Sequence, residues 1–242
     1  QVGNGLPKPV IRRNARAKHV RLRVTSDDGL VVVAPVDFDE RDIPGLLEAN
    51  REWIERALAE TPRPEPLRDP PGRIELQALR QSWRVRLRPT ITQSARAVET
   101  SYGELELRGR IAGPTEWQPA LHRWLMRTAR RELPPRLRSL AARAGFDIDL
   151  VSIRCQRSRW GSYASRPDGP GSVSLNAQLL FLPLPIVHYV MLHELCHSLI
   201  PDHSPGFWEL LEKHLPDARH LRDKLADAPR YVPRWASWRP QR

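Results

Sequence analysis

The segment His193-Glu194-Leu195-Cys196-His197 constrains this chain more than any other. Two histidines four residues apart lie one turn above the other on the same face of a helix, close enough to bind one metal ion. The residues before them, 186–192, are nearly all apolar, so the predicted helix is buried on most of its circumference. Buried histidines and a buried glutamate require a polar partner. The sequence therefore predicts a metal site on a buried helix, with His193 and His197 as ligands.

Glu194 directly follows the first of these histidines. From that position a carboxylate reaches a water molecule on the ion without being a ligand itself, which is the geometry of a general base in metal-assisted hydrolysis. Imidazole ligands suit zinc. We therefore expect a Zn²⁺-dependent hydrolase with Glu194 as its catalytic residue. Cys196, between the two histidines, is expected to be a small buried residue rather than a ligand.

A catalytic zinc site has three protein ligands and leaves a fourth position to water. His203 is the favoured third ligand, because Pro201 ends the helix and places His203 at a bend from which it can fold back. A second helix is predicted to begin after this bend, with Ser204 as N-cap and Pro205 at its first position. A carboxylate from that second helix, Glu209 or Glu212, is the alternative.

The chain has a formal net charge of +11, with 39 basic residues among its 242. Only four of them are lysines, and the arginines run through the whole chain rather than marking one patch. The charge therefore permits a nucleic acid or nucleotide partner without identifying one. The sequence shows neither a membrane span, nor a signal-peptide pattern, nor a disulfide framework, so the cytoplasm is the expected location. The oligomeric state is left open.

The first half of the sequence reads as mostly β with one helix. A basic antiparallel hairpin is predicted over 11–34, with its turn at Asp27-Asp28-Gly29, and a helix is predicted over 39–59. A proline-rich connection, 61–72, precedes strand patterns over 74–76, 83–88 and 104–107. We expect this module to span 1–114.

The second half begins with a helix at Thr115, for which Gln118 completes a possible capping box. Pro134-Pro135 is expected to kink or interrupt this helix, and Gly145 to cap its end. Strand patterns over 151–156 and 172–176 then predict a small sheet beside the metal helix. An edge of such a sheet could bind an extended peptide as an added strand. Overall the pattern predicts an α+β fold, with a second domain over 115–228 and a basic aromatic tail over 229–242.

Taken together, these residues resemble the YgjP-like metal-dependent hydrolases, relatives of the SprT-like zincins. The resemblance rests on the order of several motifs, and it extends more loosely to 11–58. The motifs are Arg157-Ser158-Arg159-Trp160-Gly161-Ser162, Leu175-Asn176, Tyr189-Val190, His193-Glu194-Leu195-Cys196-His197, His203-Ser204 and Phe207-Trp208. The sequence departs from the family pattern at Tyr163 and at Ala177-Gln178, none of which belongs to the metal set.

The resemblance implies a zincin-like domain built from a helix, a β-hairpin and the active-site helix, with zinc on His193, His197 and His203. It also implies a metallopeptidase that acts on peptides or proteins. Arg159, Tyr163 and Asn176 are candidate substrate-binding residues, and Tyr189 is a further candidate for stabilising the transition state.

Two other functions stay open at this point. Some family members carry a nucleotide-pyrophosphatase label, for which Arg154, Arg157 and Arg159 would contact phosphates. No glycine-rich phosphate loop supports that function. The other is nucleic-acid binding with a structural zinc, through the basic hairpin and the tail residues Tyr231, Trp235 and Trp238.

Overall fold

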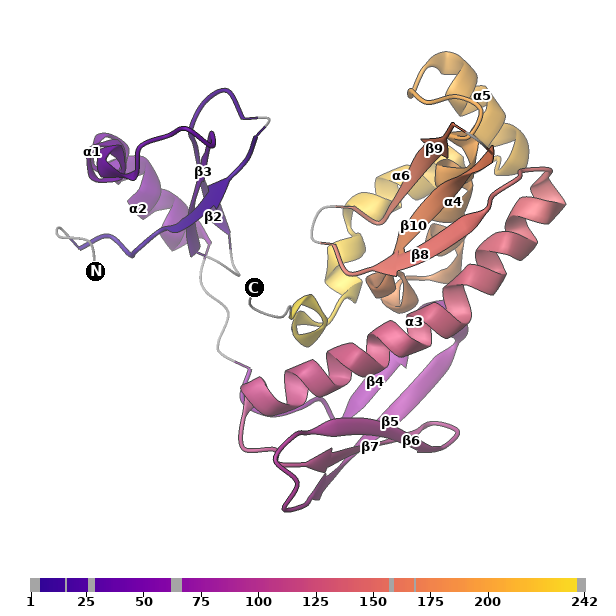
Figure 1. Cartoon of the computed structure of the whole chain (residues 1–242), viewed down its shortest axis with the longest axis horizontal. Coiled ribbons are helices and arrows are strands. Elements are labelled where there is room, and N and C mark those ends of the chain that lie inside the picture. Colours follow the sequence, from indigo (N-terminus) through magenta and orange to yellow (C-terminus); the bar gives the residue numbers. More distant parts are fainter. Residues whose placement is uncertain are drawn as a thin grey trace. The chain divides into compact units, whose positions relative to one another are not determined.

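The computed structural model describes residues 5–15, 17–25, 29–61, 67–156, 159–167 and 169–238 (Figure 1). The described chain divides into two compact units, Gln1–Pro66 and Leu67–Arg242. The fold is α+β, as predicted. None of the described helices is both long and apolar enough to cross a membrane.

The first unit is a three-stranded sheet with two short helices. Its strands are β1 (Val10–Arg13), β2 (Arg21–Thr25) and β3 (Gly29–Ala34), in the order β1-β3-β2. The predicted hairpin exists between β2 and β3, whereas β1 pairs with β3 in parallel. The middle strand, β3, is almost wholly buried because it has a neighbour on each side. Asp27 and Asp28 of the predicted turn lie outside the described residues.

The single helix predicted over 39–59 is divided into three pieces. They are a 3₁₀ turn, η1 (Glu40–Asp42), followed by α1 (Ile43–Ala49) and α2 (Arg51–Glu60). The break falls at Asn50, whose backbone leaves the helical region and whose side-chain amide donates to the Leu46 carbonyl at 2.8 Å. Such local competition by asparagine for backbone groups disfavours a continuous helix.

The second unit begins with a four-stranded sheet packed against a long helix. The strands are β4 (Arg73–Leu76), β5 (Gln81–Pro89), β6 (Arg96–Ser101) and β7 (Glu104–Gly109), in the order β4-β5-β7-β6, with a 3₁₀ turn, η2 (Gln77–Leu79), after β4. The sequence patterns did not predict β6, which lies at the sheet edge and buries little besides Ala97.

Helix α3 (Pro114–Ala144) joins this sheet to the rest of the unit, as Figure 1 shows. Its Trp124 stacks edge-on against Trp83, and the Trp124 indole donates to Glu99 at 2.9 Å. Because α3 shares one hydrophobic core with both this sheet and the helix that carries His193, the two compact units divide near residue 66, whereas the sequence predicted a boundary at 114.

The ends of α3 test the two predicted caps. Gly145 caps its end with a left-handed backbone, as predicted. At its start, however, no side chain caps the helix, so the predicted capping box is wrong. The helix also continues through Pro134 and Pro135, because the neighbouring Leu133 and Leu137 are fully buried and packing outweighs the lost hydrogen bonds.

A second sheet of three strands adjoins the metal helix. Its strands are β8 (Leu150–Arg154), β9 (Gly161–Arg166) and β10 (Gly169–Asn176), in the order β8-β10-β9. Strand β10 pairs with β8 in parallel and with β9 in antiparallel fashion, so the hairpin is formed by β9 and β10. After β10 come η3 (Ala177–Phe181), α4 (Leu184–Cys196), α5 (Pro205–His214) and α6 (Ala218–Ala226).

The predicted tail is part of this core up to Trp238 and does not form a separate segment. It contains two 3₁₀ turns, η4 (Ala228–Tyr231) and η5 (Arg234–Ser237). Trp235 is 3% exposed and stacks edge-on against Phe181, while the Gln178 amide donates to the Ala236 carbonyl at 3.0 Å. A tryptophan buried in this way cannot stack on a nucleic acid base, so this part of the nucleic-acid hypothesis is wrong for Trp235.

Candidate metal centre

Helix α4 places His193 and Glu194 in its last turn and ends at Cys196. Its other residues are mostly apolar and buried, which anchors the helix on several sides and presents the polar residues at one end. His197 is the C-cap and keeps a right-handed helical backbone. The spacing of the two histidines therefore retains its helical geometry although the helix itself stops between them.

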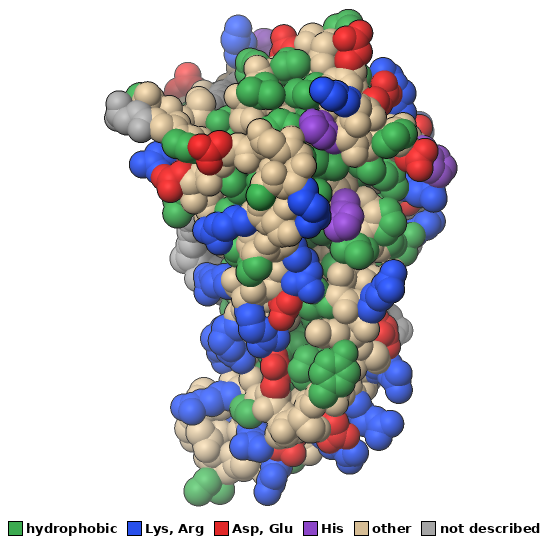
Figure 2. All heavy atoms as spheres, turned by 90° about the vertical axis from the view of Figure 1, so that its right-hand side faces the viewer, with side chains coloured by type: hydrophobic (Ala, Val, Ile, Leu, Met, Phe, Trp, Pro, Cys, Tyr) green, Lys and Arg blue, Asp and Glu red, His purple; other side chains and the backbone are tan. Residues whose placement is uncertain are grey.

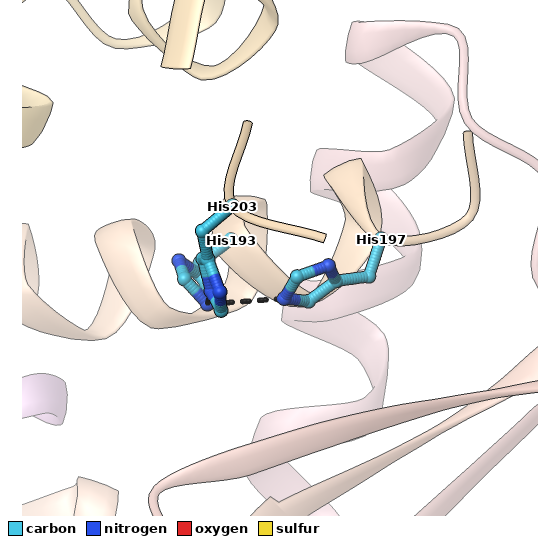
Figure 3. Close-up of side chains that lie close together, drawn as sticks. All are labelled: His193, His197 and His203. Carbon is cyan, nitrogen blue, oxygen red and sulfur yellow. Dashed lines mark hydrogen bonds between the residues drawn. The ribbon is translucent and has the colours of Figure 1, made fainter. Parts of the chain in front are cut away.

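The three histidine rings converge at the bend between α4 and α5 (Figure 3). The Nε2 atom of His193 lies 3.2 Å from Nε2 of His197 and 3.1 Å from Nε2 of His203. Their candidate ligand atoms all lie within 4.8 Å of one another. The bend is held by Asp202, whose carboxylate accepts from the Ser204 backbone N–H at 3.1 Å, and α5 begins at Pro205 with Ser204 as N-cap.

The alternative ligands lie elsewhere. Glu209 is exposed on α5, and Glu212 is paired with Arg219 at 2.5 Å. Neither belongs to the histidine cluster, and among the described residues this cluster is the one group of three metal-ligating side chains.

The chemistry of the three imidazoles fits a metal ion. The His197 Nδ1 atom lies 3.0 Å from the Ile200 carbonyl, so it carries the proton and leaves the Nε2 lone pair for a ligand bond. Burial, together with the neighbouring His197 and His203, lowers the pKa of His193 to about 4. His193 is therefore neutral near pH 7, which is the form that binds a metal.

Glu194 lies beside this cluster and is only 7% exposed. Its burial raises the pKa of the carboxyl to about 7, although the Tyr163 backbone N–H donates to it and the charge of Arg159 favours its ionised form. A carboxyl with a pKa near the working pH can both accept and release a proton.

Gly161 lets strand β9 approach Glu194 closely. A Cβ atom at this position would lie 2.6 Å from Cγ and 2.7 Å from Oε1 of Glu194. In the sequence, Gly161 is only one residue of the motif over 157–162, although a glycine within a strand often marks such an approach.

A small pocket of about 150 Å³ opens beside the metal cluster. It is bordered by His193 and Glu194 and by Tyr189 and Arg159, so two predicted substrate or transition-state residues lie at the site. Trp160 and Leu225 border it as well, and with Arg159 they also border a neighbouring pocket of about 230 Å³. Leu225 could not have been found from the sequence, because it reaches the site only through the packing of α6 on α4.

Tyr163 contributes its backbone rather than its ring to this region. Its N–H donates to Glu194, while its ring lies over Gly171, where a Cβ atom would meet the Tyr163 hydroxyl at 2.1 Å.

Asn176 has a structural role that differs from the predicted one. Its side-chain amide donates to the Gln156 and Arg159 carbonyls at 2.8 and 2.9 Å, and its oxygen accepts from the Gln178 backbone N–H. Asn176 is 3% exposed and borders the neighbouring pocket of about 230 Å³, so its contact with a substrate stays a prediction. It holds the loop between β8 and β9, whose residues Arg157 and Ser158 lie outside the described part of the chain.

A family model described as the YgjP-like metallopeptidase domain matches residues 18–228. The chain belongs to the YgjP-like family. Membership indicates a metal-dependent hydrolase of peptides or proteins and agrees with the histidine cluster of this YgjP-like domain. It gives no support for nucleic-acid binding.

A comparison with curated proteins found no match. Among solved structures, the YgjP-like chain is similar to the metallopeptidase zymogen abylysin of Pyrococcus abyssi. The identity is 25%, the match covers 38% of this chain and 89% of that one, and the TM-score is 0.33. At that TM-score the likeness carries no weight for the fold.

On the face shown in Figure 2, the basic side chains do not gather in one patch. In the view of Figure 2, arginine and lysine side chains are spread from one end of the molecule to the other, with acidic side chains among them. Many arginines are paired locally, for example Arg86 with Glu104 at 2.9 Å. On this face, the mixture of basic and acidic side chains is typical of a generally basic surface.

Proposed function

We propose that this YgjP-like domain is a zinc-dependent metallopeptidase. The observation that carries the proposal is the convergence of three histidine Nε2 atoms, with separations of 3.1 and 3.2 Å, beside a buried glutamate that is not one of them. Three ligands and an adjacent general base are the set that metal-assisted hydrolysis requires.

His193, His197 and His203 would hold the zinc ion. When bound, zinc polarises the scissile carbonyl and lowers the pKa of its water toward ~7. Glu194 takes the proton from the attacking water and passes it to the leaving amine, and its pKa of about 7 suits both steps. The Tyr163 N–H keeps the carboxylate in place.

The edge of the sheet supports a peptide as substrate. Strand β9 lies at the edge of the order β8-β10-β9, and its residues Gly161 and Tyr163 adjoin Glu194. An extended peptide can add to such an edge through main-chain hydrogen bonds, which makes few demands on its sequence. Arg159 borders the adjacent pocket, which supports its proposed contact with the substrate.

Nucleotide hydrolysis at the same site has less support. Arg154 lies at the end of β8, which β10 separates from β9, and Arg157 is outside the described residues. We therefore propose the peptidase alone.

Incubation of the full chain with unfolded casein, followed by mass spectrometry of the products, tests this function. We expect cleavage by the zinc-loaded protein, none after dipicolinate treatment, and recovery on addition of zinc. A preparation with one zinc per chain that cleaves neither casein nor a peptide library derived from a whole proteome would overturn the proposal.

Replacing Gly161 with alanine is expected to reduce kcat/KM by about 100-fold, because the new methyl group displaces the Glu194 carboxylate by a substantial fraction of an ångström. Overpacking at this site should cost about 1–3 kcal/mol of stability. Gly206→Ala is the matched control, because only Ile200 approaches its added Cβ, at 3.8 Å. Equal kcat/KM in the two variants would show that the close approach of β9 is not needed.

A further inference from the structure

A second pocket in the larger unit is lined by positively charged side chains and lies apart from the histidine cluster. Its volume is about 600 Å³. Three arginines, Arg80, Arg136 and Arg143, line it together with His188 and Ser139, and no acidic residue is among its lining residues. It shares no lining residue with the pocket beside Glu194.

Three separate elements build this pocket. Arg136, Ser139 and Arg143 follow one another at helical spacing on α3, so they share one face. His188 and Leu184 are likewise one turn apart on α4, and Arg80 comes from the turn between η2 and β5. The cations therefore converge only in the folded protein.

Two of the three guanidinium groups here, those of Arg80 and Arg143, have no carboxylate partner among the described residues. Arg143 donates to Ser139 at 2.6 Å. Within the same described part of the chain, Arg80 has no side-chain partner. Arg136 is paired with Glu132 at 2.6 Å, and Glu132 is shared with Arg131. In another pocket, two of the three lining arginines are bound to backbone carbonyls, because Arg123 donates to Ala95 at 2.8 Å and Arg127 donates to Ala97 at 2.9 Å.

Two further observations concern these cations. The first shows that two of them lie close to His188, and the second shows that Arg80 has an unfavourable backbone conformation. Burial first, and then the charges of Arg143 and Arg136, lower the pKa of His188, so both guanidinium groups lie close to its imidazole. Arg80 is also the one described non-glycine residue with a positive φ, at 52°. A left-handed backbone is unfavourable for arginine and requires compensation elsewhere.

We propose that this pocket binds a phosphate-type oxyanion through Arg80, Arg143 and Arg136. Arginine matches tetrahedral, multiply charged oxyanions because its planar donors form paired hydrogen bonds with them. The Ser139 hydroxyl and a neutral His188 add uncharged hydrogen-bonding groups at the same cavity. The site is independent of the proposed peptidase activity.

Calorimetric titration of the full chain with sodium pyrophosphate, at constant ionic strength, tests the proposal. We expect one saturable site whose affinity falls at least tenfold in Arg143→Gln. Arg138→Gln is the matched control, since Arg138 is exposed on the same helix and does not line the pocket, and it should change affinity less than twofold. Equal weakening in the two variants, or no saturable binding to the wild type, would overturn the site.

Arg80→Gly provides a second variant that folding problems do not confound. Glycine adopts a positive φ without strain, so this variant should melt at the wild-type temperature or above it while binding pyrophosphate at least tenfold more weakly. Unchanged affinity would remove Arg80 from the site.

Three further titrations define where and what the pocket binds. Binding that disappears when the protein is stripped of metal by dipicolinate would place the anion on the metal centre and refute the pocket. Citrate that binds as tightly as pyrophosphate would refute the preference for phosphate. A tighter complex with ADP than with pyrophosphate would support a phosphate carried by a larger molecule, and the reverse order would support a free phosphate anion.

Discussion

Replacing Glu194 with glutamine is expected to lower kcat/KM for peptide cleavage by about 10² to 10⁴-fold, the contribution of a positioned general base. Glutamine has nearly the same shape as glutamate, and its side-chain oxygen can still accept the Tyr163 backbone N–H. The fold should therefore be retained while the ability to take a proton is lost.

The metal content of this variant decides the interpretation. Glu194 is not one of the three converging ligands, so Glu194→Gln should still bind one zinc per chain with wild-type affinity. Glu209→Gln is the matched control, because Glu209 is exposed on α5 and outside the cluster. Wild-type turnover by Glu194→Gln would refute its role as the base, and loss of zinc would show that it acts as a ligand.

His203→Ala is expected to weaken zinc binding by more than about 100-fold, because removal of even an outer partner of a ligand typically costs 10–100-fold. The consequence should be visible in thermal unfolding. At a free zinc concentration of about 100 times Kd, a bound ion adds roughly 2.7 kcal/mol to the stability of the wild type. The variant should lose most of this gain.

The stability of the metal-free proteins is the control for this loss. His203 is exposed, and its nearest ring neighbours are the other two histidines and Phe207. Its removal should thus change the stability of the metal-free chain by no more than about 0.5 kcal/mol. His220→Ala, at an exposed position on α6, should leave both quantities unchanged. Full zinc content and an unchanged thermal response in His203→Ala would mean that another residue, such as Glu212, supplies the third ligand.

The sequence was most informative where the chemistry is local. The spacing of His193 and His197 places them on one face of any helix, and Pro201 with Ser204-Pro205 determines where the chain bends and where α5 begins. Those few residues were enough to predict the convergence of His203 with the other two histidines. Strands in which apolar and polar residues alternate clearly, such as 104–107, were also predicted, because this alternation is a local feature of the sequence.

Predictions that depended on distant neighbours were less successful. Strand β6 was missed because its burial pattern is weak and its position is determined by pairing with β7. The two compact units divide at residue 66, whereas the sequence predicted a boundary at 114, because the sheet before α3 shares its core with the helix. The structural role of Asn176 was not predicted, because its polar atoms bind backbone groups up to 20 residues away.

By itself, then, the sequence predicted the convergence of the three histidines and the α+β class, since helical and strand periodicity and proline geometry act over a few residues. Tertiary structure alone decided the close approach of Gly161 to Glu194 and the burial that raises the pKa of Glu194. It also decided the meeting of Arg80, Arg143 and His188 in one pocket. Each of these depends on the packing of segments that are far apart in the chain, and packing distances are not encoded in local sequence patterns.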